Sequence, residues 1–152
     1  MQPMLEPMLA FLHISAVLGL VVFASSEAAL CRAEWMNAAV VDRLVRVNAI
    51  GWIASAVLLL SGLARMVWGD KGWAWLASNP LLHLKLALFA VVLLLALRPT
   101  RRYRRWRRAL QAGGGLPAAA EIQAARRSVM IQTHLIALIP LAAVFLARGW
   151  GR

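Results

Sequence analysis

Four long runs of apolar residues, separated by short polar or charged stretches, dominate the chain. They cover about residues 5–30, 47–68, 80–97 and 128–147. Each comes close to the ~20 residues that a helix needs to cross the hydrocarbon core of a bilayer. The pattern therefore predicts an all-α integral membrane protein, a single domain of residues 1–152 folded as an up-down four-helix transmembrane bundle.

The third run has the clearest boundaries. Asn79-Pro80 opens it, because a proline in the first helical turn lacks only an N–H that would have no partner there. Arg98-Pro99 is predicted to close it, since the residue before a proline disfavours the helical conformation. The strongly basic segment 98–127 that follows, with three glycines in its middle, is predicted to be a loop.

Lysine and arginine are distributed unevenly among the connections. Three lie between the first and second runs and nine between the third and fourth, whereas four lie at the opposite ends. The positive-inside rule then places both termini on the outer face and segment 98–127 in the cytoplasm, in a multi-pass protein of the inner (cytoplasmic) membrane. Five tryptophans near the run ends fit the aromatic belts of the two interfaces: Trp68, Trp73, Trp75 and Trp150 outside, and Trp106 inside.

Composition agrees with membrane insertion. Apolar residues make up 62% of the 152 positions, against ~45–50% in soluble domains. The net charge of +11 comes largely from seven arginines within residues 98–108. Directly after an apolar run, such a cluster favours contact with anionic lipid headgroups over nucleic-acid binding. Cys31 is the only cysteine, so an intramolecular disulfide is excluded.

Six ionisable side chains lie inside the predicted spans, where each needs a partner or a purpose because burial in lipid is costly: His13, Glu27, Arg65, His83, Lys85 and His134. Glu6, His13, Leu20, Glu27 and Glu34 are spaced by seven, which predicts one inward-facing column on the first helix. A stripe of small and polar residues in the second run, Asn48, Gly51, Ser55, Gly62 and Arg65, predicts close helix packing and an arginine aimed into the bundle.

Four of these six residues fall in the same half of the predicted bilayer. His13, Arg65, His83 and Lys85 come from three different spans and lie toward the outer side. Imidazoles and cations without an equal number of acids suit a ligand that carries carboxylates and needs an axial imidazole. We therefore expect a b-type haem or a related porphyrin. Zinc or copper alone fits less well beside two cations.

Several short motifs resemble a family of bacterial four-span membrane proteins classed as a domain of unknown function, DUF2214, over essentially the whole chain. The motifs are Leu12-His13, Ser26-Glu27, Gly62-Leu63-Ala64-Arg65, Lys71-Gly72, Asn79-Pro80-Leu81-Leu82-His83-Leu84-Lys85, Pro99-Thr100 and Ala147-Arg148-Gly149-Trp150. A more distant resemblance links His13 and Lys85 to the first-span histidine and third-span lysine of the J-type protoporphyrinogen oxidases, which implies bound haem b.

The leading hypothesis is a haem-binding membrane redox protein, with a haem-dependent oxidoreductase as the enzyme class to test. His13 would ligate the iron, Arg65 and Lys85 would meet the propionates, and His83 would be a second ligand or propionate contact. Glu27 and His134 would form a proton path from the cytoplasm. Two alternatives stay open: a cofactor-free structural or assembly subunit that packs on itself or on a membrane partner, and a proton or ion pathway.

Overall fold

The computed structural model describes residues 2–68 and 78–148. The predictions for Lys71-Gly72, Trp73, Trp75 and Trp150 lie outside these residues. Four long helices make up most of the described chain: α1 (Gln2–Leu30), α2 (Ala38–Trp68), α4 (Pro80–Gln111) and α5 (Ala119–Ala147). A single 3-10 turn, η1 (Ala33–Trp35), joins α1 to α2.

Three of the helices are long and apolar enough to cross a membrane: α1 from Met4 to Leu30, α2 and α4. The all-helical prediction is therefore confirmed, and the apolar helices mark a membrane protein. Helix α5 contains the fourth predicted span, 128–147, but is not one of the three helices that meet these criteria within the described residues. The fourth span and the orientation of the termini stay predictions.

Helix α2 begins nine residues earlier than the apolar run that predicted it, at Ala38 rather than near position 47. The Asn37 side chain caps the helix, because its Oδ1 accepts a hydrogen bond from the Val40 amide at 3.0 Å. Arginine is a good helix former, so the charged turns after Asn37 continue into the apolar segment without a break.

Helix α4 begins as predicted and ends much later than predicted. The Asn79 side chain accepts from the Leu81 amide at 2.9 Å, and Pro80 occupies the first turn. The helix passes through Pro99 and reaches Gln111, so most of segment 98–127, predicted as a loop, is helical. The prediction overrated one proline: Pro99 removes a single N–H donor, whereas the arginines after it favour helix.

The end of α4 is a Schellman motif. Gly113 has a φ of +79°, a conformation that glycine adopts without strain. The Gly113 and Gly114 amides donate to the carbonyls of Leu110 at 3.1 Å and Ala109 at 2.8 Å. These bonds satisfy carbonyls that the helix end would leave open. The glycine stretch is thus the stop signal that the sequence suggested, placed at the end of a longer helix.

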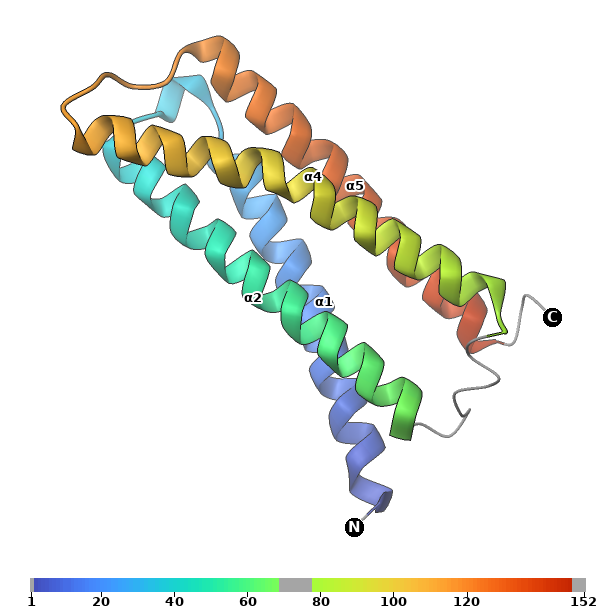
Figure 1. Cartoon of the computed structure of the whole chain (residues 1–152). Coiled ribbons are helices and arrows are strands. Elements are labelled where there is room, and N and C mark those ends of the chain that lie inside the picture. The colour runs from blue at the N-terminus through green and yellow to red at the C-terminus, as the bar shows by residue number, and fades with distance from the viewer. Residues whose placement is uncertain (1, 69–77, 149–152) are drawn as a thin grey trace.

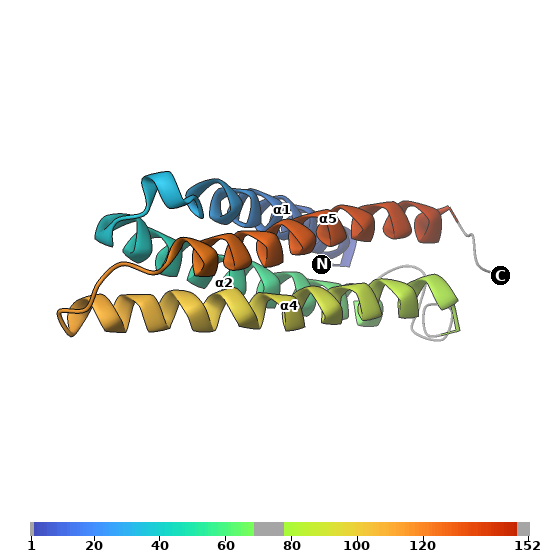
Figure 2. The same cartoon turned by 90° about the horizontal axis from the view of Figure 1, so that it is seen from above.

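The helices run up and down as two hairpins, α1 with α2 and α4 with α5, packed side by side (Figures 1 and 2). We call the end with the 31–37 and 112–118 connections the loop end, and the end where α1 and α4 begin the terminal end. At the terminal end the first turns of α1 point away from the end of α5 (Figure 1).

Buried apolar residues form three clusters along the bundle. The middle cluster joins all four helices, including Leu20, Leu58, Val92 and Ile136. The loop-end cluster contains Tyr103 and Trp106, whose rings are 5.5 Å apart. Trp106 is therefore a buried core residue, and its prediction as an interface anchor is wrong. The terminal-end cluster described here consists of the buried residues Met66 and Leu82, with Leu81 packed against them.

Candidate functional site

His13 lies near the terminal end of α1 and points into the bundle, with 8% of its surface exposed. Its Nδ1 is 3.0 Å from Ser61 Oγ on α2. The hydroxyl of Ser61 itself donates to the Leu58 carbonyl at 3.2 Å. With the Ser61 proton directed to Leu58, the hydroxyl accepts from His13, whose neutral ring then carries its proton on Nδ1. In this tautomer the other ring nitrogen, Nε2, holds a lone pair.

Gly62 makes room for this imidazole. A Cβ at position 62 would lie 3.2 Å from His13 Cε1 and 3.6 Å from Nδ1. Gly51, about three turns nearer the loop end, would place a Cβ 3.9 Å from Glu27 Oε1. The small-residue stripe of α2 thus packs against the inward column of α1, as predicted. Leu20 and Glu27 of that column are buried, whereas Glu34 lies beyond the end of α1 in η1 and is exposed.

Two cations accompany His13 at the terminal end. Arg65 forms an ion pair with Glu6, whose Oε1 is 2.8 Å from Nη2 and 3.1 Å from Nε. Lys85 of α4 is half-buried at the same end. In the described part of the chain the ion pairs are Arg65 with Glu6 and Arg105 with Glu121, and Lys85 is in neither.

The other two histidines lie on the outside of the bundle. His83 and His134 are both exposed. The Nδ1 of His134 is 2.6 Å from the Met130 carbonyl one turn earlier on its own helix. The structure therefore brings together His13, Arg65 and Lys85 of the predicted site, and it places His83 and His134 away from the buried interior.

A second polar group is buried nearer the loop end and links three helices. Glu27 of α1 accepts a hydrogen bond from Asn48 Nδ2 of α2 at 3.0 Å. Thr100 Oγ1 of α4 is 2.8 Å from Asn48 Oδ1 and accepts from Trp52 Nε1 at 2.9 Å. We call these four residues the Glu27 network. Its members satisfy one another in the bundle interior, as buried polar groups must.

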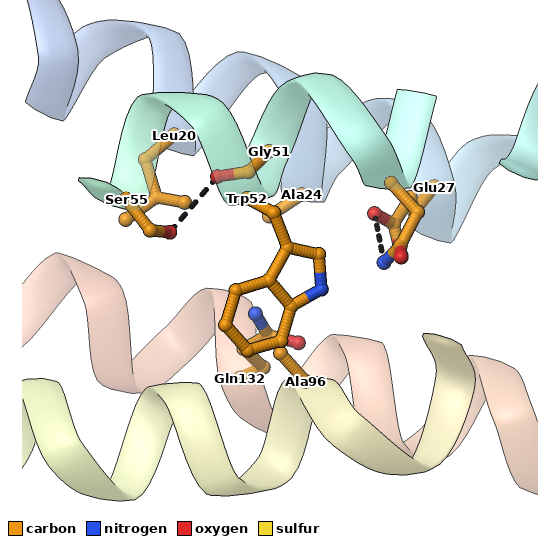
Figure 3. Close-up of a pocket in the computed structure, with 9 residues that line it drawn as sticks. Leu20, Ala24, Glu27, Gly51, Trp52, Ser55, Ala96 and Gln132 are labelled. Atoms are coloured by element: carbon orange, nitrogen blue, oxygen red, sulfur yellow. Dashed lines mark hydrogen bonds between the residues drawn. The ribbon is translucent and has the colours of Figure 1, made fainter. Parts of the chain in front are cut away.

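The Glu27 network borders a small cavity of about 20 Å³. Figure 3 shows the Trp52 ring reaching from α2 toward Ala96 and Gln132, with Glu27 on one side and Ser55 on the other. A polar cavity of this size holds about one water molecule. Neither this cavity nor the second one described below is lined by His13, Arg65 or Lys85.

Sequence reasoning missed several of these polar partners. Ser61 is next to the predicted stripe, but Gly62 was chosen as the member of the stripe at that point. Thr100 stands among arginines that were assigned to a loop. Gln132 is two residues before His134, which was chosen as the candidate on that helix. The available signal was spacing: Thr100 lies one turn after Ala96, a small residue facing the core, so it shares the buried face of α4.

Two ionisable groups at the loop end, Cys31 and Glu121, lie outside the apolar spans and have shifted pKa values. Burial raises the pKa of the Cys31 thiol, which lies against Tyr103 and the Ile122 carbonyl. Such a thiol is unreactive. The Trp106 indole donates to Glu121 at 2.9 Å and Arg105 pairs with it at 2.6 Å. These partners hold the pKa of Glu121 below its ordinary value.

The donor set limits which metal group this interior suits. Within residues 2–68 and 78–148, no three His, Cys, Asp or Glu side chains gather into a group that could hold a metal ion. A haem differs, because its porphyrin supplies four ligands and the protein needs to add only one or two. The free Nε2 of His13, supported by Ser61 behind the ring, is the type of donor that binds such an iron.

Three apolar helices of spanning length, closed around a polar interior, define a helical membrane protein. The chain belongs to the family of predicted membrane proteins described as DUF2214, whose model matches residues 5–151. Searches of curated proteins and of solved structures found no match. The comparisons give no support to the resemblance to J-type protoporphyrinogen oxidases.

Proposed function

We propose that the chain is a membrane redox protein that binds a b-type haem or a related porphyrin at the terminal end of its bundle. The single observation that carries the proposal is the position of His13: its imidazole is buried, and its Nδ1 lies 3.0 Å from Ser61 Oγ, which favours the tautomer with a lone pair on Nε2. Histidine ligands of metals are held in the same way, by a hydrogen bond from the other ring nitrogen.

The charges around His13 suit the two carboxylates of such a porphyrin. Arg65 is already paired with one carboxylate, Glu6, and Lys85 is in neither ion pair of the described residues. A bound propionate at Lys85 would be held by a charge-assisted hydrogen bond. His83, exposed two residues earlier, lies on the opposite side of α4 and is not needed in this arrangement.

Room for the group would come from the terminal end of the bundle, where the first turns of α1 diverge from α5 (Figure 1). Separation of the two hairpins there would expose Nε2 without disturbing the Glu27 network or the middle cluster. When bound, the iron would supply one-electron chemistry, while His13, Arg65 and Lys85 would position it.

For the membrane placement we propose four spans with both termini outside. The segments between the first and second and between the third and fourth predicted spans lie at the loop end, because α1 and α4 end there (Figure 1). By sequence these two segments hold twelve of the lysines and arginines, whereas four belong to the segments predicted on the opposite side. Such a difference favours a cytoplasmic loop end and an inner-membrane location.

The visible spectrum of the detergent-purified full chain, oxidised and reduced, tests the function. We expect a Soret band in wild type that His13→Ala removes or strongly shifts, because the iron loses its main bond to the protein. His134→Ala is the matched control, since that imidazole is exposed and bonded to its own helix. Far-UV circular dichroism checks that both variants keep their helices.

A full Soret band of unchanged position in His13→Ala would refute the ligand assignment. A colourless wild type that added haem does not restore would refute the cofactor itself and favour a structural or assembly subunit. Lys85→Ala should retain the iron ligand and weaken retention by ~1–3 kcal/mol, the scale of a hydrogen bond to a charged group.

A proton pathway is the second candidate, favoured by the Glu27 network and its water-sized cavity. Glu27, Asn48, Ser55 and Gln132 all line that cavity, so a water there has polar partners on three helices. His134 lies outside this group and is not part of the path we propose. Proton flux into liposomes that Glu27→Gln abolishes would support this function, and equal flux in that variant would refute it.

A further inference from the structure

A second cavity, of about 420 Å³, opens between α2 and α4 at the loop end. Four arginines line it, Arg46 from α2 and Arg104, Arg107 and Arg108 from α4. Asn48 and Thr100 of the Glu27 network also line it, on the side toward the bundle interior. We call this cavity the arginine pocket. Its volume lies within the ~300–1,000 Å³ range of small-molecule sites.

The positive charge of the arginine pocket is not neutralised by the protein. No aspartate or glutamate lines the cavity. The two ion pairs found in the described part of the chain are Arg65 with Glu6 and Arg105 with Glu121, so the lining arginines take part in neither. Glu27, the acid nearest in the network, already accepts from Asn48. An anion that enters the cavity would therefore meet guanidinium groups and no competing carboxylate on its wall.

Arg107 adds an independent observation. Its Nε is buried and has no hydrogen-bond partner. Buried donors in folded proteins are nearly always paired, and Arg107 lines the cavity, so an anion seated there would offer this guanidinium an acceptor; Arg102 Nη1, away from the cavity, is also without a partner. A guanidinium donates through a planar fork, which matches the oxygens of phosphate or carboxylate groups.

We propose that the arginine pocket binds a phosphate-bearing anion. The α4 arginines of the pocket begin at Arg104, about two turns after the last apolar residue of α4's hydrophobic run, Leu97, where the hydrocarbon layer of a bilayer would end and its phosphates would begin. The phosphate belongs either to an anionic phospholipid headgroup or to a soluble compound. The site is separate from the proposed haem site and does not depend on it.

Two titrations of the full chain distinguish the sources of phosphate. In the first, phosphatidylglycerol is added to the protein in detergent and bound lipid is counted by native mass spectrometry. In the second, pyrophosphate is added to the protein in phosphatidylcholine nanodiscs and binding is measured by calorimetry. Saturable binding in the first alone assigns the headgroup, and binding in the second assigns a soluble ligand. Absence of saturable binding in both overturns the proposal.

Matched variants locate the binding. Arg104→Gln with Arg107→Gln removes two lining charges, and Arg98→Gln with Arg101→Gln removes the same charge from exposed positions of the same helix. We expect the first pair to weaken binding about tenfold or more and the second pair much less. Equal losses would show diffuse attraction to a basic helix and overturn the pocket. If the first pair fails to fold, the two lysine replacements keep the charge without the fork and should bind with intermediate affinity.

Discussion

Replacing Asn48 by leucine should destabilise the bundle more than its position on one helix suggests, because Asn48 connects three helices. Its amide donates to Glu27 on α1 at 3.0 Å and its carbonyl lies 2.8 Å from the Thr100 hydroxyl on α4. Leucine has a similar size and no polar atoms. The substitution therefore removes both bonds and leaves two buried partners behind.

The two partners should not suffer equally. Thr100 Oγ1 is also 2.7 Å from the Ala96 carbonyl, so its proton has another acceptor when Asn48 is lost. Glu27 loses its amide donor. An unpaired buried group costs ~1–3 kcal/mol, whereas hydrogen bonds between membrane helices average ~0.6 kcal/mol. We expect Asn48→Leu to lower the free energy of unfolding by ~1–3 kcal/mol, mostly through Glu27.

Unfolding of the full chain in dodecylmaltoside micelles by added SDS, followed by far-UV circular dichroism, measures this change. Ser26→Ala is the control, because that half-buried side chain donates its hydroxyl to the Val22 carbonyl of its own helix at 2.8 Å. It should stay within about ±0.5 kcal/mol of wild type. Glu27→Leu combined with Asn48→Leu removes donor and acceptor together. This double variant should cost less than the sum of the two single ones.

Two results would refute the reasoning. If Asn48→Leu were as stable as Ser26→Ala, the Glu27 network would contribute nothing to packing. If the Glu27 and Asn48 effects were additive, the two side chains would not interact as the 3.0 Å distance requires.

Three further predictions concern packing, pH and topology. Gly62→Ala should lower the free energy of unfolding by ~1–2 kcal/mol in the same assay, because the new methyl group would lie 3.2 Å from His13 Cε1. Gly51→Ala, with 3.9 Å to its nearest neighbour, should be stabilising by ~0.5–1 kcal/mol, and equal effects of the two would contradict the close contact. The pKa of Glu121 is held below its ordinary value of 4.5, mainly by the Trp106 indole. The ionised carboxylate therefore stabilises the folded state at higher pH. This stabilisation is lost as the pH falls through the folded-state pKa. Between roughly pH 6 and pH 3 the melting temperature should therefore fall more steeply for wild type than for Glu121→Gln. Parallel curves of melting temperature against pH would exclude the contact between Trp106 and Glu121. Reporter fusions should place both chain ends outside, and a cytoplasmic C-terminus would reverse the proposed orientation.

The sequence by itself determined that the chain is helical and apolar enough for a membrane, and which face of α1 turns inward. Period and composition suffice for this, because a helix in lipid must satisfy its own backbone and hide its polar side chains. The seven-residue spacing of His13, Leu20 and Glu27 therefore predicted three buried residues correctly. The same spacing failed at Glu34, since it assumes that the helix continues, and α1 ends at Leu30.

Only the tertiary structure decided which polar residues meet. Asn48 and Thr100 are 52 positions apart, and His13 and Ser61 are 48 apart, so no local pattern reports either pair. His83 was predicted to join His13 because both lie at a similar depth in the bilayer. In the structure His83 is on the exposed side of α4, whereas His13 is buried. The length of α4 was likewise decided by tertiary packing. The arginine-rich segment after Leu97 stays helical because Tyr103 and Trp106 within it pack into the loop-end core.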